Sequence, residues 1–550
     1  MSEDNIICFD TEDDSKGNFL CACFYDGKSI EIYYTKDDCL AYIRNKMGYI
    51  FWAHNLDYDL NNIYSEKLVF LQRNYAGGRI IFATDLRNNV KFYDSFNHTF
   101  SSLDAMSKFT ELEKIPYDFQ GKINLKKLTE HCVRDTEILY YCIKELRDFY
   151  LTYNVEMRAT VASNALAIFI KNYSDKEYIL GSTKYDKETL KLAYFGGRVE
   201  CFDFNYHRKV YKYDFNSLYP FVMLNDFPDI FSLNNKKCNI DNFEGCAYVK
   251  VKIFDSYYGV LPYRDINNKV IFPIGIFQGW YSYIELRYII DNKLGVILEI
   301  FDYIQFSKSD KVFYNYVISL YKEKQNSIGL RREFVKRLLV SLYGKFAEIR
   351  QPQIMTYISN VKDHSKIKYT YPDGICYLEF NLGYARHSNM IWSIYVTSYG
   401  RILLDQYIRK YHSLYSDTDS IFTIDPLPNN LVSQNELGKL KLEGIAQARF
   451  YGNKIYRFGK DWICKGIPKD QAKNAIQLGR AEFRKPIKYK ESLRRKDKLK
   501  ANIWITMSKE INLDYDKRIV KKDGLSIPIC LGASEKSERK GKKENGKNDA

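Results

Sequence analysis

The sequence lacks several features that mark other classes of protein. It has only 5 Trp and 12 Pro in 550 residues, and its 12 Cys form no CxxC pair and have no His partners at zinc spacing. We therefore expect reduced thiols in a reducing compartment. No apolar run reaches membrane-spanning length, and the acidic start MSEDNIICFDTEDD has no basic n-region. These absences predict a soluble chain with no signal peptide, transit peptide or membrane partner.

Basic and aromatic residues are abundant. Lys and Arg number 83 against 68 Asp and Glu, a net charge of +15, and there are 48 Tyr and 34 Phe. A positive surface favours a polyanionic partner, and some tyrosines are candidates for stacking on bases or sugars. The alternatives are a solvated basic surface and the codon bias of an AT-rich genome.

The length and patterning predict several domains. A chain of 550 residues exceeds one compact core. Roughly the first 150 residues alternate β-like runs with helical patterns, as in a mixed α/β domain. A helical stretch over 154–173 and one basic helix over about 311–346 follow, with no internal repeat. The charged end, SEKSERKGKKENGKNDA, predicts a disordered tail.

Four carboxylates mark the first domain. Asp10 and Glu12 in CFDTE are two residues apart and share one face of the first strand. Asp59 follows the apolar run YIFWA, and Asp135 is predicted to open a helix, where an acid suits the helix dipole. Any one of these carboxylates by itself is more simply explained as a helix N-cap, a turn residue or a solvated side chain. Together they predict a two-metal site that activates water against a phosphodiester.

A second set of carboxylates lies in the later half. YSDTDS places Asp417 and Asp419 two residues apart in an apolar, β-branched stretch, which predicts a strand–turn–strand hairpin with both carboxylates on one face. The alternative is an exposed turn. Asp214 closes a β-like run in VYKYDFNSLYP and completes a cluster for two Mg²⁺ ions.

The basic helix supplies the opposite charge. Within YKEKQNSIGLRREFVKRLLVSLYGKF, Arg332, Lys336 and Tyr343 share one helical face. Lys324 lies within about a third of a turn of Lys336. Such a face would grip a triphosphate while a base pair lies against Tyr343, and Gly344 would permit close approach of the backbone. The alternative is an amphipathic basic helix on the protein surface.

In the same order along the chain, these segments resemble the motifs of family B DNA polymerases, and specifically the protein-primed branch of small linear-genome phages, linear plasmids and related viruses. DFNSLYP, KRLLVSLYGKF and YSDTDS are similar to its three polymerase motifs. CFDTE, HNLDYD and HCVRD are similar to its proofreading exonuclease motifs. GNKIYRF, CKGIPK, YFGGRV and SSLDAM are similar to its KxY, thumb-side lysine, YxGG and single-strand-binding elements.

The resemblance implies a multidomain α/β and α+β fold, with an RNase H-like 3′–5′ exonuclease domain and a right-hand polymerase of palm, fingers and thumb. The implied regions are the exonuclease domain (1–155), the linker and start of the palm (156–225), the terminal-protein-docking insertion (226–315), the fingers (316–349), the β-rich strand-displacement insertion (350–385), the palm with the DTD hairpin (386–440), the thumb region (441–533) and the disordered tail (534–550).

The implied function is a DNA-directed DNA polymerase that replicates a linear genome from a terminal-protein primer, with strand displacement and 3′–5′ proofreading. The resemblance implies two Mg²⁺ ions per active site, replaceable by Mn²⁺, and as partners template and primer DNA, dNTPs and a terminal protein. It also implies a monomer in the cytoplasm of the host cell. The alternatives are a family B polymerase that extends ordinary nucleic-acid primers and a catalytically dead nucleic-acid-binding protein. The presence of Asp214, Asp417 and Asp419 together with Lys336 argues against the latter.

The resemblance also assigns residues to roles. Catalytic and metal-binding residues are Asp10, Glu12, Asp59, Asp135, Asp214, Asp417 and Asp419, with Phe215 among the metal ligands. Nucleotide-binding residues are Tyr219, as the gate against ribose, with Lys324, Lys336 and Tyr343. DNA-binding residues are His54, Asn55, Tyr58, Ser102, Leu103, Tyr194, Gly196, Gly197, Lys454, Tyr456 and Lys465.

Two positions depart from the family pattern. Val340 stands where the fingers motif usually has asparagine, and we expect an apolar neighbour in the palm to compensate for the lost amide. His131 stands where the third exonuclease motif usually has tyrosine, a side chain that helps to orient the attacking water. Because histidine titrates near neutral pH and tyrosine does not, the rate of the exonuclease reaction is not predicted by the family pattern.

Overall fold

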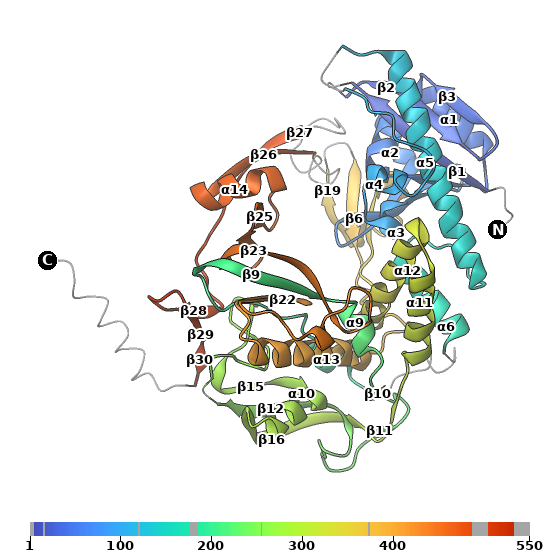
Figure 1. The fold of residues 1–550 in the computed structure, drawn as a ribbon. Coiled ribbons are helices and arrows are strands. Elements are labelled where there is room, and N and C mark those ends of the chain that lie inside the picture. The colour runs from blue at the N-terminus through green and yellow to red at the C-terminus, as the bar shows by residue number, and fades with distance from the viewer. Residues whose placement is uncertain are drawn as a thin grey trace. The chain divides into compact units, whose positions relative to one another are not determined.

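The computed structural model describes residues 5–14, 17–118, 122–174, 185–254, 256–371, 374–486 and 504–532. The chain forms two compact units (Figure 1). Unit 1 contains Met1–Leu180, Ile318–Ser388 and Arg484–Thr506, and unit 2 contains Gly181–Val317, Asn389–Phe483 and Met507–Ala550. The tail predicted to be disordered, 534–550, lies outside the described residues, as does 487–503 of the predicted thumb region.

Unit 1 is built on a ten-stranded sheet with the order β19-β20-β18-β5-β6-β7-β4-β1-β2-β3. β1 pairs antiparallel with β2 and parallel with β4. The first seven strands are β1 (Ile6–Asp13), β2 (Phe19–Tyr25), β3 (Ile30–Tyr33), β4 (Ile50–Ala53), β5 (Leu71–Ala76), β6 (Arg79–Asp85) and β7 (Val90–Asp94). Alternation along β1 gives its two faces different roles: Ile7 and Phe9 lie in the main core of the unit, while Asp10 and Glu12 face the other way.

The long helix α5 (Leu125–Thr152) packs on β1 and β2 (Figure 1). The Asn124 side chain caps it by accepting a hydrogen bond from the Lys127 backbone N–H at 3.2 Å. The helix therefore begins ten residues before Asp135, and the expectation that Asp135 opens a helix is wrong. Residues 125–134 contain no Pro or Gly that would delay helix formation. Asp135 is held against the sheet from the helix interior, so the helix dipole does not explain its position.

The shorter helices of unit 1 are α1 (Lys36–Asn45), α2 (Leu56–Tyr64), α3 (Phe96–Thr99), α4 (Leu103–Ser107) and α6 (Val161–Asn172). The helix expected over 154–173 begins only at Val161. Thr160 is its N-cap and accepts a hydrogen bond from the Ser163 backbone N–H at 3.2 Å, which fixes the start of α6.

Residues 350–385 extend the sheet of unit 1. They contain β18 (Gln353–Tyr357), β19 (Ile367–Thr370) and β20 (Ile375–Glu379), and β18 pairs antiparallel with β5. Met355 and Tyr377 are buried in the same core as Phe9. The segment is β-rich as expected, but two of its strands help to close the core of unit 1, so deleting it would disturb this core as well as any DNA contact.

The predicted basic helix is two helices. α11 (Tyr314–Asn326) ends before Ser327, and α12 (Gly329–Ser341) begins at Gly329, which has a left-handed φ of +57°. This conformation is open to glycine at little cost and interrupts helical hydrogen bonding. Tyr343 lies beyond α12 in the 3₁₀ helix η2 (Tyr343–Ala347). The prediction of one continuous helical face is therefore wrong: Lys324 lies on α11, Arg332 and Lys336 lie on α12, and Tyr343 lies in η2.

Unit 2 contains a seven-stranded antiparallel sheet with the order β25-β24-β23-β9-β22-β21-β8. Its strands are β8 (Val199–Cys201), β9 (Tyr206–Phe215), β21 (Tyr415–Asp417), β22 (Ser420–Thr423), β23 (Leu440–Gly452), β24 (Ile455–Phe458) and β25 (Asp461–Cys464). Its helices include α8 (Lys187–Lys191), α9 (Leu218–Val222), α10 (Tyr283–Asp291), α13 (Met390–Lys410) and α14 (Lys469–Leu478).

The predicted docking insertion, 226–315, supplies most of a second sheet in unit 2, with the order β11-β16-β12-β15-β30. These strands are β11 (Leu233–Asn234), β12 (Glu244–Ile253), β15 (Ile274–Ser282), β16 (Gly295–Phe306) and β30 (Cys530–Leu531). β30 comes from the other end of the chain and pairs parallel with β15.

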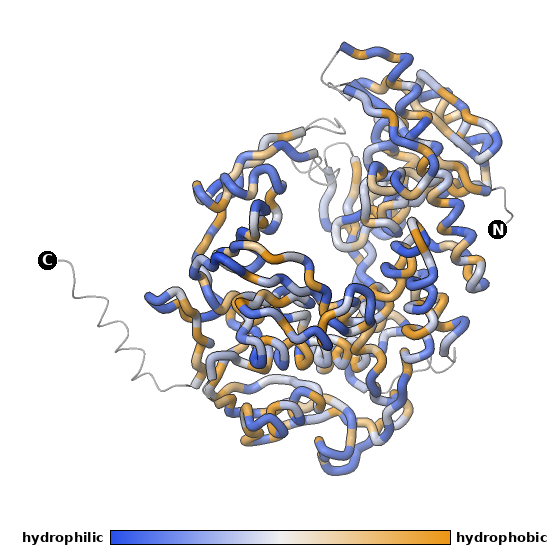
Figure 2. The backbone as a smooth tube through the Cα atoms, in the orientation of Figure 1, coloured by the Kyte–Doolittle hydropathy of each residue, from blue (hydrophilic) through white to orange (hydrophobic). Residues whose placement is uncertain are grey.

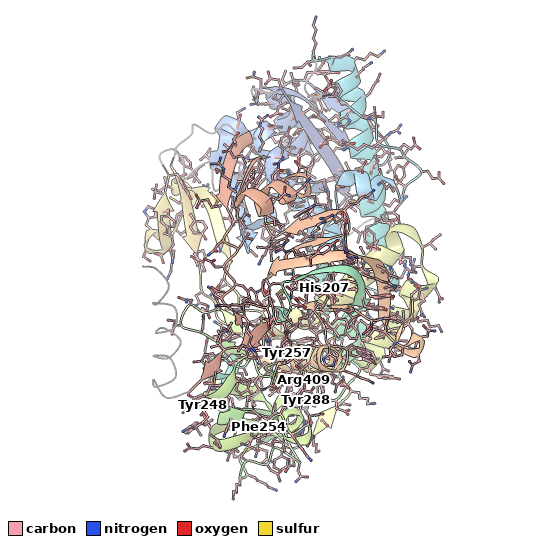
Figure 3. All side chains as sticks on the ribbon, turned by 60° about the vertical axis from the view of Figure 1, so that its left-hand side comes forward. His207, Tyr248, Phe254, Tyr257, Tyr288 and Arg409 are labelled. Carbon is pink, nitrogen blue, oxygen red and sulfur yellow. The ribbon has the colours of Figure 1, made fainter. Side chains whose placement is uncertain are left out.

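A buried ionic network in unit 2 connects α10 and α13 with Arg198, which directly precedes β8. Asp405 accepts hydrogen bonds from Arg198 Nη1 at 2.6 Å, Arg409 Nε at 2.6 Å and Tyr288 Oη at 3.0 Å. Tyr288 and Arg409 are marked in Figure 3. Because a buried carboxylate is costly unless it is paired, this network favours a single relative position for the three elements.

No helix in the described part of the chain has the length and apolar character needed to cross a membrane. In Figure 2, hydrophobic and hydrophilic residues are interspersed along most elements, as in amphipathic helices and strands.

Candidate active sites

The four carboxylates predicted in the first domain come together in unit 1. Asp10 and Glu12 lie on β1, Asp59 on α2 and Asp135 on α5. Burial, and then repulsion from Asp135, raise the pKa of Asp10 to about 8. Burial, and then repulsion from Asp10, raise the pKa of Glu12 to about 10. Burial, and then repulsion from Asp10, also raise the pKa of Asp59. The residues thus form one electrostatically coupled cluster.

Two buried oxygens of this cluster have no hydrogen-bond partner among the described residues: Asp59 Oδ2 and Asp135 Oδ1. The other oxygens of these carboxylates are held, with Asp59 Oδ1 accepting from Thr11 Oγ1 at 2.8 Å and Asp135 Oδ2 lying 2.7 Å from Lys114 Nζ. Buried carboxylate oxygens are normally paired. Hard oxygen ligands that repel one another and lack donors fit a divalent cation such as Mg²⁺.

Two further side chains complete this site. His131 Nε2 lies 3.7 Å from Glu12 Oε1 and 3.6 Å from Asp135 Oδ2, so the residue that departs from the family pattern does sit among the carboxylates. Its Nδ1 is hydrogen-bonded to the Ile115 carbonyl. Lys114, which the sequence analysis missed, pairs with Asp135. It lies 21 residues away in a stretch without regular structure, where no periodicity points to it.

The raised pKa values predict a change in stability. In the metal-free protein the folded state keeps protons that the unfolded state has lost, so the free energy of unfolding falls as pH rises from about 4 through the raised pKa values. We expect Asp10→Asn with Glu12→Gln to raise the metal-free melting temperature near pH 8 by a few degrees, at roughly 2–4 °C per kcal/mol. We also expect it to reduce the increase that Mg²⁺ causes in the parent, because the unit 1 site is lost while the unit 2 carboxylates remain. Thermal denaturation with chelator and with Mg²⁺ measures both. An unchanged response to Mg²⁺ would place the metal elsewhere.

The HNLDYD residues lie beside this cluster. Tyr58 Oη donates to Asp13 Oδ1 at 2.8 Å, and burial raises the pKa of Tyr58. His54 is hydrogen-bonded to Ser95 Oγ at 2.9 Å, and burial, and then the charge of Lys114, lower its pKa to about 4. Asn55 adopts a left-handed φ of 76°. The neutral imidazole and the strained turn are positioned by the fold next to the carboxylates.

Ser102 and Leu103 have structural roles at the start of α4. The Ser102 hydroxyl caps this helix by accepting from the Ala105 backbone N–H at 3.2 Å, and Leu103 is buried. Their predicted contact with single-stranded DNA remains a prediction.

The YSDTDS segment of unit 2 forms the expected hairpin. β21 ends at Asp417, β22 begins at Ser420, and Thr418 turns the chain with a φ of 62°. Asp419 therefore lies in the turn, and the alternation argument that placed it on the strand face with Asp417 is wrong. The tip is fixed by backbone hydrogen bonds, with Thr418 N–H donating to the Arg198 carbonyl at 2.8 Å.

The third aspartate of unit 2 lies in register with the hairpin. Asp214 on β9 faces Ser420 on β22, which in turn faces Asp417 on β21. Residues directly opposite in antiparallel strands project from the same face, so Asp214 and Asp417 flank Ser420 on one surface. The Phe215 backbone N–H donates to the Asp419 carbonyl at 2.8 Å, which brings the turn to the end of β9. Burial, and then repulsion from Asp417, raise the pKa of Asp419. These oxygen donors also fit a divalent cation.

The predicted DNA-contacting lysines adjoin the hairpin. Lys454 Nζ lies 2.9 Å from Asp417 Oδ1, and the Lys465 backbone N–H donates to the Lys454 carbonyl at 3.0 Å. Tyr456 packs against Tyr415 and Phe422, with ring centroids 5.4 Å and 5.5 Å away. Lys454 thus supplies the positive charge beside Asp417, a contact 37 residues apart that the sequence analysis did not predict.

The YFGGRV segment is held by two arginines, the buried Arg401 and the partly buried Arg264. Arg401 Nη1 donates to the Phe195 and Gly196 carbonyls at 2.7 Å and 3.0 Å, and Arg264 Nη2 donates to the Tyr194 carbonyl at 2.5 Å. A Cβ atom at Gly197 would lie 2.8 Å from Thr418 Cγ2 and 3.0 Å from Tyr219 Oη. The proposed sugar gate, Tyr219, therefore packs directly against the YFGGRV segment beside the hairpin tip.

This contact makes Gly197 sensitive to substitution. We expect Gly197→Ala to displace Thr418 or Tyr219 and to slow nucleotide addition by about tenfold to a hundredfold, because overpacking typically costs about 1–3 kcal/mol. A Cβ atom at Gly196 meets no atom within 4 Å, so Gly196→Ala is the matched variant without the clash. Single-nucleotide incorporation rates compare the two. Equal rates would show that the contact is not needed.

The predicted nucleotide-binding lysines lie in unit 1, on two helices. Burial, and then repulsion from Lys336 and Arg332, lower the pKa of Lys324 to about 8. Arg332 Nη1 also donates to the Lys324 carbonyl at 3.4 Å. The three cations therefore gather across the break between α11 and α12, and a bound anion would relieve their repulsion. Val340 is 41% exposed, and the compensating apolar neighbour expected in the palm stays a prediction.

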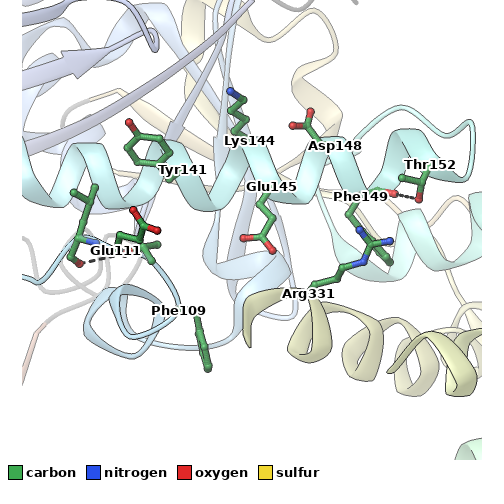
Figure 4. A pocket seen from close by; sticks show the side chains of 11 residues that line it. Phe109, Glu111, Tyr141, Lys144, Glu145, Asp148, Phe149, Thr152 and Arg331 are labelled. Carbon is green, nitrogen blue, oxygen red and sulfur yellow. Dashed lines mark hydrogen bonds between the residues drawn. The ribbon is translucent and has the colours of Figure 1, made fainter. Parts of the chain in front are cut away.

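A pocket of about 580 Å³ lies in unit 1 between α5, the 109–112 loop and α12 (Figure 4). Glu145 and Arg331 are among its lining residues, and Arg331 stacks on the Phe149 ring at 5.2 Å. None of the predicted site residues is among the described residues that line it.

The chain is similar to several known polymerases. Residues 118–382 match a family model described as DNA polymerase type B, organellar and viral. A probable DNA polymerase of Podospora anserina is 30% identical over 475 residues, covering 70% of this chain and 39% of that protein. One of Ascobolus immersus is 26% identical over 433 residues, covering 73% and 34%. The chain thus spans well under half the length of these two relatives.

Solved structures share the fold. Phi29 DNA polymerase complexed with primer-template DNA and incoming nucleotides has a TM-score of 0.72 at 16% identity, covering 92% of this chain and 99% of that one. The fold class expected from the sequence is confirmed: a multidomain, mixed α/β chain with the fold of this polymerase.

Proposed function

Because this chain belongs to the organellar and viral type B DNA polymerase family, we propose that it is a DNA-directed DNA polymerase with a 3′–5′ exonuclease. The observation that carries the proposal is the presence of one carboxylate cluster in each compact unit, each at the positions where the family motifs occur. Two separate clusters suit two separate reactions on phosphodiesters.

In unit 2, we assign nucleotide addition to the surface formed by Asp214, Asp417 and Asp419. Bound Mg²⁺ ions would neutralise the triphosphate and lower the pKa of the primer 3′ hydroxyl. Lys454 holds Asp417 in place through its ion pair. Tyr219, packed against Gly197, would stand under the sugar and exclude ribose. The contact of Lys324 and Lys336 in unit 1 with a triphosphate stays a prediction.

In unit 1, we assign 3′–5′ degradation to Asp10, Glu12, Asp59 and Asp135. Bound metal ions would activate a water against the terminal phosphodiester. His131 Nε2 lies 3.7 Å from Glu12 Oε1 and 3.6 Å from Asp135 Oδ2, where it can help to position the metal-binding carboxylates. The ammonium of Lys114 keeps the Asp135 carboxylate in place through their contact at 2.7 Å.

We further propose that the 226–315 segment docks a terminal protein that primes synthesis. Supporting this, β16 exposes a row of apolar side chains: Val296, Leu298, Ile300 and Phe301, each 40–48% exposed. Extension of ordinary nucleic-acid primers is the alternative. We also propose that the protein is a monomer in the cytoplasm of the host cell and that Mn²⁺ can replace Mg²⁺.

The priming test uses candidate small basic proteins encoded beside this chain. Each is mixed with the polymerase, a labelled dNTP and Mg²⁺, and a labelled protein–nucleotide adduct is sought on a denaturing gel. We expect Leu298→Asp to reduce adduct formation while extension of a DNA primer continues. The control, Val520→Asp, changes a similarly exposed valine on β28 (Arg518–Val520). Normal primer extension with no adduct from any candidate would favour ordinary priming.

Strand displacement is assigned to exposed basic residues of the 350–385 segment, since its strands β18 and β20 belong to the core. We expect the triple change Lys362→Ala, Lys366→Ala and Lys368→Ala to shorten products on duplex templates and to leave short extension on single-stranded templates unchanged, because it weakens retention and not chemistry. The control pair is Lys521→Ala with Lys522→Ala, also exposed. Product lengths equal to those of the parent would exclude this role.

A further inference from the structure

Three cysteine thiols lie beside the carboxylates of unit 1. The register of β1 and β2 places Asp10 opposite Cys23 and Glu12 opposite Cys21. Because directly opposite residues project from the same face, two thiols and two carboxylates share the surface that α5 covers. Cys132 on α5 packs with Cys21 and Cys23 in one fully buried cluster.

Cys132 extends from this thiol cluster to the carboxylates. Its Sγ donates a hydrogen bond to the Asp10 carbonyl at 3.4 Å. Ligand atoms of Asp10, Glu12 and Cys132 all lie within 4.8 Å of one another. Ligand atoms of a tetrahedral zinc ion lie about 3.3–3.8 Å apart, so side-chain movements of about 1 Å would bring all three onto one cation. The unpartnered Asp59 Oδ2 and Asp135 Oδ1 independently indicate that a cation belongs in this cluster.

We propose that Cys132 is a protein ligand of the metal site formed by Asp10 and Glu12, an inference that rests on the exonuclease proposed above. A thiolate beside carboxylates favours thiophilic divalent ions such as Zn²⁺ over Mg²⁺. The thiol proton leaves to solvent when the metal binds. Cys21 and Cys23 act as positioning residues that hold the Cys132 side chain through their contacts.

The consequence is a difference between the two clusters. The unit 2 cluster offers the oxygen atoms of Asp214, Asp417 and Asp419, the ligands that Mg²⁺ prefers. The unit 1 cluster adds sulfur. We therefore expect Zn²⁺ to compete with Mg²⁺ at the exonuclease at concentrations that leave nucleotide addition unaffected.

The test uses Co²⁺ as a spectroscopic probe on the full chain, because cobalt bound to thiolate absorbs strongly in the near ultraviolet and cobalt bound only to oxygen does not. We expect this band in the parent and its loss in Cys132→Ser. Zn²⁺ should displace the cobalt. Competition with a chromophoric chelator measures the dissociation constant of Zn²⁺, which should be at least about tenfold larger in Cys132→Ser, a loss of about 1.4 kcal/mol of binding free energy. The matched control is Cys142→Ser, a buried thiol on the same helix that faces Cys8.

A further variant, Asp10→Asn, separates the possible outcomes. Absence of the band in the parent, or its persistence in Cys132→Ser, would overturn the proposal. A band that survives Asp10→Asn but not Cys132→Ser would place the metal among the thiols alone and would overturn it as well. Another outcome is that calorimetry detects Co²⁺ binding that depends on Asp10 while the parent shows no absorption band. This result would exclude Cys132 as a metal ligand and would still support the metal site proposed for the exonuclease. No Asp10-dependent binding at all would overturn the exonuclease site itself.

Discussion

Replacing Asp417 with alanine is expected to abolish nucleotide addition, by roughly a hundredfold or more, while 3′–5′ degradation of single strands continues. Asp417 ends β21 on the surface that it shares with Asp214, and it is paired with Lys454 at 2.9 Å. The alanine variant loses a metal ligand and leaves the lysine ammonium without its carboxylate, so a positive charge remains where a cation should bind. Asp214→Ala is expected to have the same effect.

The measurement compares primer extension with degradation of a labelled single strand by the same preparation. Asp425→Ala is the control, because this aspartate lies two residues beyond β22 and is exposed. Retained degradation shows that the variant is folded. If either Asp417→Ala or Asp214→Ala removed both activities, a single shared site would replace the two-site proposal.

The reciprocal change is expected to remove proofreading and spare synthesis. Asp10→Ala with Glu12→Ala takes away the two β1 carboxylates of the unit 1 cluster, and degradation should fall by roughly a hundredfold or more. The fold should tolerate the change, because burial, and then repulsion from neighbouring carboxylates, make the charged forms of Asp10 and Glu12 unfavourable in the metal-free protein and raise their pKa values.

The assay presents a primer with a mismatched 3′ end and follows both its removal and the extension of a matched primer. The control, Asp104→Ala with Glu130→Ala, removes two exposed carboxylates from the same unit. If the double variant still trimmed mismatched ends, the assignment of degradation to unit 1 would be wrong. If it also lost synthesis of the matched primer, the two units would depend on each other.

The sequence alone determined the features that depend on local chemistry. The period of two along β1 placed Asp10 and Glu12 on one face, and the structure agrees because the strand runs unbroken through both. YSDTDS predicted a hairpin because a polar pair between β-branched runs makes a tight turn. The family motifs, in order along the chain, determined the fold class, since each motif is a short segment that can be read without knowing its partners.

Local patterns failed where a single residue changes the backbone. Periodicity alone predicted one basic helix, but Gly329 adopts a left-handed conformation and separates α11 from α12. Alternation placed Asp419 on a strand, but Thr418 turns the chain there. The start of α5 was misplaced because Asn124 caps the helix eleven residues before Asp135. In each case one residue outweighed a regular pattern.

Only the tertiary structure decided which distant segments meet. Lys114 forms an ion pair with Asp135, Lys454 forms one with Asp417, and β18 pairs with β5. No periodic pattern in the sequence predicts any of these contacts. The meeting of Cys132 with the β1 carboxylates likewise depends on the register of β1 with β2 and on how α5 packs on them. Such contacts arise from sheet register and helix packing across the whole core, so their free energy belongs to the assembled fold and not to any one segment.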